Sequence, residues 1–198
     1  MTQTITPKRR DRWADWAVIG LLAVALLLGT AVMALAQGQT AEAVDAEAGL
    51  TVHYPQGWLL KPADNLVFQA VNPNAADFKT AFQAQVTPIV AGDAVTPTLA
   101  LALNNLSLSR AQQQTAYRLF DIEEGKPLDG QPTMEATYAY VLKSNDLFSQ
   151  RMPVVVQGLD IAVGQGDQAV IFSLLASKDA FAAAETDFRR FVESAELR

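Results

Sequence analysis

Residues 178–195 read KDAFAAAETDFRRFVESA, and this stretch predicts the element that organises the fold. Its apolar residues fall at positions i, i+3, i+7, i+10, i+11 and i+14, which is the spacing of one continuous helical face. They are Phe181, Ala184, Phe188, Phe191, Val192 and Ala195. Ser177 stands where an N-cap residue is expected. We therefore expect a C-terminal helix that packs its phenylalanines on a sheet.

Strand patterns fill much of the chain before this helix. Strands are expected at 50–54, 58–60, 65–71, 82–90, 117–123, 133–142, 153–163 and 168–176. Pro88 has no N–H to donate, which limits 82–90 to an edge position or a short run. Thr96 and Pro97 are typical of a helix start, so a helix is expected to about Gln113, although the stretch TLALAL also fits a strand. The order of elements predicts an α+β sandwich with a mainly antiparallel sheet.

A long apolar run lies near the N-terminus. Residues 16–36 contain no ionisable side chain, and at about 1.5 Å per residue they would span roughly 30 Å, the thickness of a bilayer core. Residues 1–15 carry four basic and two acidic side chains. Basic residues beside an apolar run stay in the cytoplasm. We therefore expect a cytoplasmic segment at 1–15, a single transmembrane helix at 16–36 and an extracytoplasmic domain.

A cleaved signal peptide is the alternative for the same run. Residues 34–36 have the small-x-small form of a cleavage site, but the apolar core is longer than that of an ordinary signal peptide. Both alternatives place the following domain outside the cytoplasm. Residues 37–49 are small, polar and acidic, which predicts a flexible tether before a domain at 50–198.

Charge and composition narrow the function classes. Residues 37–198 carry 11 basic and 19 acidic side chains, a net charge of −8. Proteins that bind nucleic acid need a basic surface, so this charge argues against that function. The chain has no cysteine, which removes thiol catalysis and thiolate metal sites. We expect no nucleic-acid partner, no metal and no cofactor.

The stretch TVHYPQGW at 51–58 holds the chain's only histidine. His53 could act as a general base or a metal ligand, but one histidine without cysteine makes a poor zinc site, and strand alternation places it opposite the apolar residues. Proline followed by glycine is typical of a turn. We interpret Tyr54, Pro55, Gly57 and Trp58 as a structural corner, with Trp58 as a core anchor and not a ligand platform.

Other candidate sites favour structural roles as well. Ser177 and Lys178 are adjacent and lack the spacing of a catalytic Ser-Lys pair. The stretch GQG at 164–166 is followed by no helix and predicts a hairpin turn. The acidic run at 121–124 lacks the pattern of a calcium loop and predicts a solvated strand. Tyr138 and Tyr140 share one strand face, which is either core or, if uncovered, an interaction face.

Three stretches together resemble the PsbP-like superfamily. They are YPQGW at 54–58, LDGQPTMEATYAYV at 128–141 and FRRFVESAEL at 188–197, and the resemblance covers roughly 49–197. The resemblance implies an α/β/α sandwich with a mainly antiparallel sheet. It also implies an accessory or binding domain that associates with larger complexes without catalysis of its own. No catalytic residues come with this pattern.

These observations favour a membrane-anchored, extracytoplasmic accessory or interaction protein, associated with a larger membrane complex through a protein partner. The alternative is an envelope domain that binds a small molecule or lipid in a pocket between helix and sheet. We do not expect an enzyme, because no nucleophile and base stand in a catalytic pattern, and a hydrolase is the third hypothesis.

Overall fold

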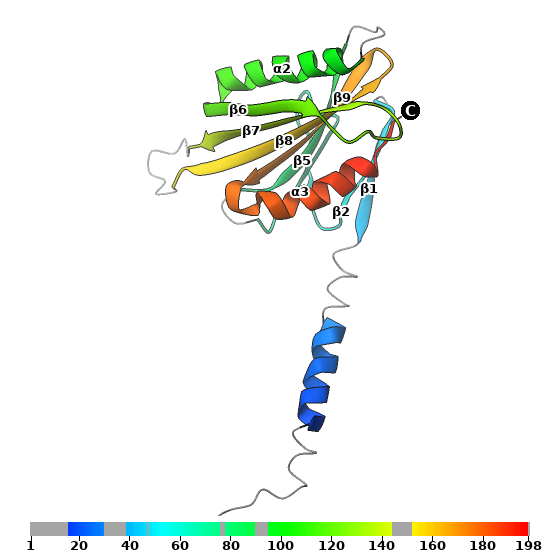
Figure 1. Cartoon of the computed structure of the whole chain (residues 1–198), viewed down its shortest axis with the longest axis vertical. Coiled ribbons are helices and arrows are strands. Elements are labelled where there is room, and N and C mark those ends of the chain that lie inside the picture. Colours follow the sequence, from blue (N-terminus) through cyan, green and yellow to red (C-terminus); the bar gives the residue numbers. More distant parts are fainter. Residues whose placement is uncertain are drawn as a thin grey trace, which may run out of the picture. The chain divides into compact units, whose positions relative to one another are not determined.

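The computed structural model describes residues 16–29, 39–46, 48–75, 78–89, 95–143 and 152–197. The chain divides into two compact units, Met1–Gln39 and Thr40–Arg198. In the first unit, residues 16–29 form a helix (Figure 1, dark blue). Within the described part of the chain, no helix combines the length and apolar character needed to cross a membrane. Residues 1–15 and 30–38, which include the whole expected cytoplasmic segment and the end of the expected transmembrane helix, lie outside that part.

The second unit is built on two antiparallel sheets. The larger has seven strands in the order β3-β4-β5-β9-β8-β7-β6, and the smaller has the order β1-β2-β10. The large sheet comprises β3 (Leu59–Leu60), β4 (Phe68–Val71), β5 (Ala81–Pro88), β6 (Thr115–Glu124), β7 (Thr133–Leu142), β8 (Val154–Gln165) and β9 (Gln168–Ser177). The small sheet comprises β1 (Thr40–Asp45), β2 (Leu50–Pro55) and β10 (Glu196–Leu197).

Two helices cover opposite faces of the large sheet (Figure 1). Helix α2 (Val95–Gln113) packs Leu99 and Leu103 on one face, against Ala162 and Ile171 among others. Helix α3 (Lys178–Glu193) packs on the other face, which it shares with the small sheet. The faces alternate along each strand, so neighbouring residues of β8 and β9 belong to different cores. The predicted α+β fold with a mainly antiparallel sheet is confirmed.

The ring of Phe191 is the hub of the core under α3. Its centroid lies 5.2–6.0 Å from those of four other phenylalanines, which are Phe68, Phe82, Phe172 and Phe188. The predicted helical face is therefore the buried face of α3. The helix ends at Glu193, two residues earlier than the apolar pattern suggests, because Ser194 forms the C-cap and the chain turns toward β10. Ser177 occupies the N-cap position without a side-chain capping hydrogen bond.

The structure corrects two expectations about strands. Residues 40–45 belong to the expected tether but form β1, which pairs with β2 over six residues. Its alternating inward residues are mostly alanines, which give a weak apolar signal, and the pairing with β2 supplies the order that this composition lacks. Of the two alternatives for 82–90, the edge position is wrong, because β5 lies between β4 and β9, whereas the strand does end early, at Pro88. Pro88 is its last residue, so the missing N–H limits where β5 ends without preventing the earlier residues from pairing.

Candidate functional site

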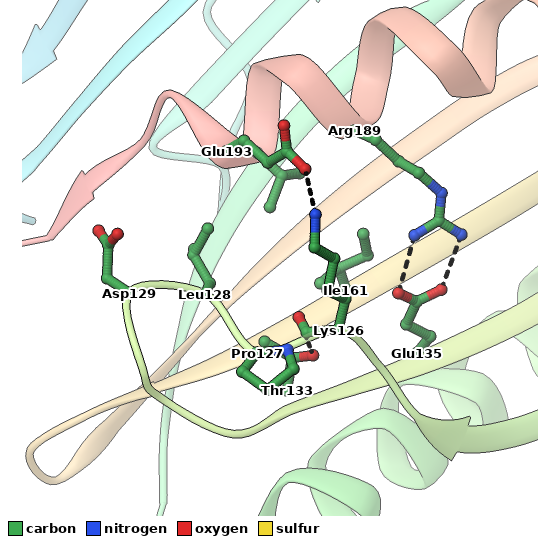
Figure 2. A pocket seen from close by; sticks show the side chains of 10 residues that line it. Lys126, Pro127, Leu128, Asp129, Thr133, Glu135, Ile161, Arg189 and Glu193 are labelled. Carbon is green, nitrogen blue, oxygen red and sulfur yellow. Dashed lines mark hydrogen bonds and ion pairs between the residues drawn. The ribbon is translucent and has the colours of Figure 1, made fainter.

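A pocket of about 370 Å³ opens between α3, strands β7 and β8, and the loop that joins β6 to β7 (Figure 2). Its lining residues are Lys126, Pro127, Leu128, Asp129, Thr133, Glu135, Ile161, Arg189, Val192 and Glu193. They come from three separate parts of the sequence, which the sheet register and the docking of α3 bring together. The pocket lies on the face of the sheet that α3 covers.

A tight turn shapes the loop side of the pocket. Leu128 and Gln131 exchange two backbone hydrogen bonds of 3.0 and 2.8 Å, and Asp129 and Gly130 between them have φ angles of 47° and 79°. Positive φ at both central residues is the backbone of a type I′ turn, which an Asp-Gly pair favours. The turn points Leu128 back into the core, where it is buried.

A fixed ion pair forms one side of the pocket. Arg189 on α3 donates two parallel hydrogen bonds of 2.9 Å to the two carboxylate oxygens of Glu135 on β7 (Figure 2), and its Nε donates to Glu185 at 3.0 Å. The hydrogen bonds to Glu135 raise the pKa of Arg189 above its ordinary value. Two-pronged arginine–carboxylate contacts fix geometry as well as charge. This pair therefore holds α3 on the sheet, and its charged groups are not available to bind a partner.

A second ion pair lies across the pocket and is far less constrained. Lys126 reaches from the loop to Glu193 on α3, with 3.1 Å between Nζ and Oε1 (Figure 2). The two side chains are 80% and 55% exposed. An ion pair so exposed contributes about 0–1 kcal/mol, because water screens the charges. Lys126 and Glu193 can therefore leave one another for another charged group at little cost.

The chemistry of the lining suits recognition. Leu128, Ile161 and Val192 provide apolar wall, while two basic and three acidic side chains line the pocket for a net charge of −1. Thr133 carries the only side-chain hydroxyl among these lining residues, and it donates to the carbonyl oxygen of Lys126 at 3.0 Å. The pocket can bind an apolar group flanked by charge.

The corner at the start of the domain lies elsewhere. The N–H of Trp58 donates to the carbonyl oxygen of Pro55 at 3.2 Å, Gly57 has a φ of 88°, and Trp58 packs on Phe82 with 4.4 Å between ring centroids. Tyr54 is buried in the core under α3. These contacts are those of a packed turn, and the structural role of Tyr54, Pro55, Gly57 and Trp58 stays a prediction.

His53 lies on the opposite face of β2 from the buried residues of that strand, and its backbone N–H donates to Ser194 Oγ at 3.3 Å. Across the described ranges, no group of three or more histidine, cysteine, aspartate or glutamate side chains converges in a way that could hold a metal ion. The acidic side chains Asp121, Glu123 and Glu124 are exposed on β6. Gly166 and Asp167 form the turn between β8 and β9, as the hairpin prediction required.

Tyr138 and Tyr140 are both buried, at 1% and 8% exposure, so they form no uncovered interaction face here. They belong to a polar cluster under α2 that the sequence reasoning missed. Arg110 on α2 pairs with Asp160 on β8 and donates to Ser173 Oγ at 3.2 Å, while the hydroxyl of Tyr138 donates to Asp160 at 3.3 Å. The aspartate inside the apolar run VVVQGLDIAV was the available signal for this cluster.

Burial decides the electrostatics of this cluster. Burial lowers the pKa of Arg110, but the carboxylate of Asp160 together with the nearby tyrosines Tyr138 and Tyr117 outweighs that effect and holds the pKa above its ordinary value. Burial also raises the pKa of Tyr138, Tyr140 and Tyr117. The guanidinium of Arg110 lies 4.6 Å from the centroid of the Tyr138 ring. The cluster joins α2 to the sheet through the Arg110–Asp160 ion pair and the hydrogen bonds of Ser173 and Tyr138.

Comparison with solved structures shows that the chain shares its fold with cyanobacterial PsbP and with Mog1. The chain resembles cyanobacterial PsbP (CyanoP) from Synechocystis sp. PCC 6803, with a TM-score of 0.59 and 14% identity over 80% of this chain and 92% of that chain. It also resembles LpqN of Mycobacterium tuberculosis, a protein involved in cell envelope biogenesis (TM-score 0.51, 12% identity, 80% and 90% covered). A mutant of the protein Mog1 gives a TM-score of 0.52 at 11% identity, with 80% and 96% covered.

No family model and no curated protein matches this chain in sequence. At these identities the likeness concerns the fold alone. The resemblance expected from the three sequence stretches is confirmed at that level, since the chain folds as a PsbP-like domain.

Proposed function

We propose that this chain is a membrane-anchored accessory protein whose PsbP-like domain binds a protein partner through the pocket between α3 and the β6–β7 loop. The observation that carries the proposal is the lining of that pocket, which joins an apolar wall to a loosely held, exposed ion pair. A partner that inserts an apolar side chain and re-pairs Lys126 or Glu193 gains contact area without breaking a strong contact in this domain.

The anchoring part of the proposal rests on the sequence. Residues 16–36 are apolar and uncharged, and they follow a segment in which basic residues outnumber acidic ones. This arrangement keeps the N-terminus in the cytoplasm and places the domain outside it. The involvement of LpqN in cell envelope biogenesis supports the same location for a domain of this fold. The partner is then a subunit of a membrane complex.

To test the proposal, the tagged full-length chain is extracted from its native membranes with a mild detergent. The extract is then separated by size, and the fractions that contain the chain are identified by mass spectrometry. We expect the chain to migrate with a defined larger complex. The variant Lys126→Glu reverses the exposed charge at the pocket and should release the chain from that complex. Lys178→Glu is the matched control, because Lys178 is also exposed but lies at the start of α3, outside the pocket lining.

Each outcome has a distinct meaning for the pocket and for the anchor. If the complex is recovered equally with both lysine variants, the pocket is not the binding site. If the unaltered chain migrates by itself, without a larger complex, the chain has no stable protein partner. A chain that lacks 16–36 should no longer sediment with membranes, and continued sedimentation would count against the anchor.

A second candidate function rests on a different pocket. A cavity of about 330 Å³ lies between strands β1 and β2 and the segment from β3 to β4, with Leu50, Val52, Leu60, Val67 and Phe68 in its lining. This volume is at the lower end of the range for small-molecule sites, and the lining is mainly apolar. A lipid or small apolar ligand that binds there should raise the melting temperature of the chain. Phe68→Ala should abolish that increase at matched ligand concentration.

A further inference from the structure

The outer face of α2 carries no charge. The helix has 19 residues, and Arg110 is its only ionisable side chain. Arg110 points inward, where it pairs with Asp160. The exposed residues of the helix are Pro97, Leu101, Asn104, Asn105, Leu108, Ser109, Ala111, Gln112 and Gln113. The whole exposed face is therefore neutral, in contrast to the acidic remainder of the domain.

Two large apolar side chains stand on this neutral face. Leu101 and Leu108 are 58% and 56% exposed, and they are seven residues apart, two helical turns along the same side. Asn104 and Asn105 lie between them. The inward side has its own leucines, Leu99 and Leu103, which are fully buried on the sheet. A helix with leucines on both sides is typical of one that is covered on both sides.

The distribution of charge indicates which molecule can bind the outer face of α2. Residues 37–198 carry a net charge of −8, so two copies of the domain repel one another over most of their surfaces. The outer face of α2 has no charge to repel its own copy. A membrane surface is a poorer match, because helices that lie on membranes carry basic residues beside their apolar face, and here none is exposed. A charged protein would find no complementary charge on α2.

We propose that two copies of this chain associate through α2, packed antiparallel about a two-fold axis that passes between Asn104 and Asn105. That axis places Leu101 of one copy against Leu108 of the other and each Asn104 beside the other copy's Asn105. The leucines bury apolar area at both ends of the contact, and the asparagine amides can donate and accept across the axis. Asparagine between apolar positions is a device that fixes register in paired helices.

This association does not depend on the proposed function. Helix α2 covers one face of the sheet, whereas the pocket that we propose for a partner lies on the α3 face. A chain can therefore fail one test and pass the other.

The first experiment measures the mass of the purified full-length chain over a range of concentrations by sedimentation. We expect a dimer in equilibrium with a monomer. The double variant Leu101→Glu with Leu108→Glu places like charges on both sides of the contact and should weaken association by at least about tenfold. Glutamate is a good helix former and both sites are exposed, so the fold should persist, which circular dichroism checks. Leu59→Glu is the control, since Leu59 is 53% exposed on β3, away from α2.

The second experiment tests the antiparallel geometry. In the variant Leu101→Lys with Leu108→Glu, the two-fold axis sets each lysine against a glutamate of the other copy, so association should be recovered relative to the double-glutamate variant. Parallel packing would set lysine against lysine, and no recovery would follow. A monomer at every concentration, or a dimer equally strong in the double-glutamate variant, would overturn the proposal.

Discussion

Tyr138 on β7 lies directly opposite Gly158 on β8, and its ring occupies the space that a side chain at position 158 would need. A Cβ added to Gly158 would lie 2.1 Å from Tyr138 Cζ and 2.5 Å from its hydroxyl oxygen. The absence of that Cβ lets the ring lie flat over β8, where the hydroxyl reaches Asp160 at 3.3 Å. The glycine and the polar cluster under α2 are therefore one structural unit.

Gly158→Ala should destabilise the domain by about 1–3 kcal/mol, because the added methyl group forces the buried tyrosine out of its position. Urea unfolding followed by circular dichroism measures the change. Gly164→Ala on the same strand is the control and should cost less, since its Cβ would approach only Val95 Cγ1, at 3.1 Å. Equal costs for the two variants would contradict the role assigned to the Tyr138 contact.

Asp160→Ala should cost about 3–5 kcal/mol, because it leaves the buried guanidinium of Arg110 without its partner. The exposed pair between Arg190 and Asp187 offers a comparison in the same domain, and Asp187→Ala should cost only about 0–1 kcal/mol. Replacing both members of the buried pair, Arg110→Met with Asp160→Leu, should recover most of the lost stability. A double variant as unstable as Asp160→Ala would contradict this explanation.

Stability should fall as the pH rises above about 10. Burial raises the pKa of Tyr138, Tyr140 and Tyr117, so the folded chain keeps protons that the unfolded chain loses near pH 10. The folded state then binds more protons than the unfolded state, and the free energy of unfolding decreases with pH. Below pH 10 this contribution is fully present, and it is lost as the pH rises toward the folded-state values.

The variant Tyr138→Phe isolates one of these protons. It should reduce the slope of the free energy of unfolding against pH, between about pH 10 and 11, by up to about 1.4 kcal/mol per pH unit. Urea titrations at closely spaced pH values measure the slope. An identical slope in the two proteins would mean that Tyr138 does not hold its proton in the fold.

Phe191→Ala should destabilise the domain by about 3–5 kcal/mol, because it removes the ring that contacts four other phenylalanines. Phe181→Ala on the same helix should cost clearly less, since Phe181 is only partly buried at the edge of that core. Thermal unfolding of both variants, with the helix content checked by circular dichroism, gives the comparison. A larger loss at Phe181 would place the centre of the core elsewhere.

Local sequence patterns were sufficient to predict the helices and strands that have one strongly apolar face. The spacing of Phe188 and Phe191 predicts α3, and the alternation in 133–142 gives β7 with its observed bounds. Strand β1 could not be predicted in the same way, because Ala41 and Ala43 bury too little apolar area to produce a clear period. Its order depends on β2, which a local pattern does not reveal.

The ion pairs at the pocket and under α2 join residues that are far apart in the sequence, so no local pattern could predict them. Glu135 stands in an apolar strand, which marks it as unusual, but its partner Arg189 is 54 residues away. Arg110 and Asp160 are separated by 50 residues. Which residues meet is decided by strand register and by the position at which each helix docks. Composition and charge predict against nucleic-acid binding and thiol chemistry, whereas the residues of the pocket could be recognised only in the folded chain.

Strand β2 also constrains the order in which a growing chain can complete this domain. One edge of β2 pairs with β1, which precedes it by only a few residues. The other edge pairs with β10 at the far end of the chain, where Glu196 and Leu197 lie opposite Thr51 and Leu50. During synthesis from the N-terminus, nearly 150 residues must emerge before that pairing can form. The small sheet therefore closes last, and a nascent chain halted before α3 would keep Leu50 and Val52 unburied and open to chaperones.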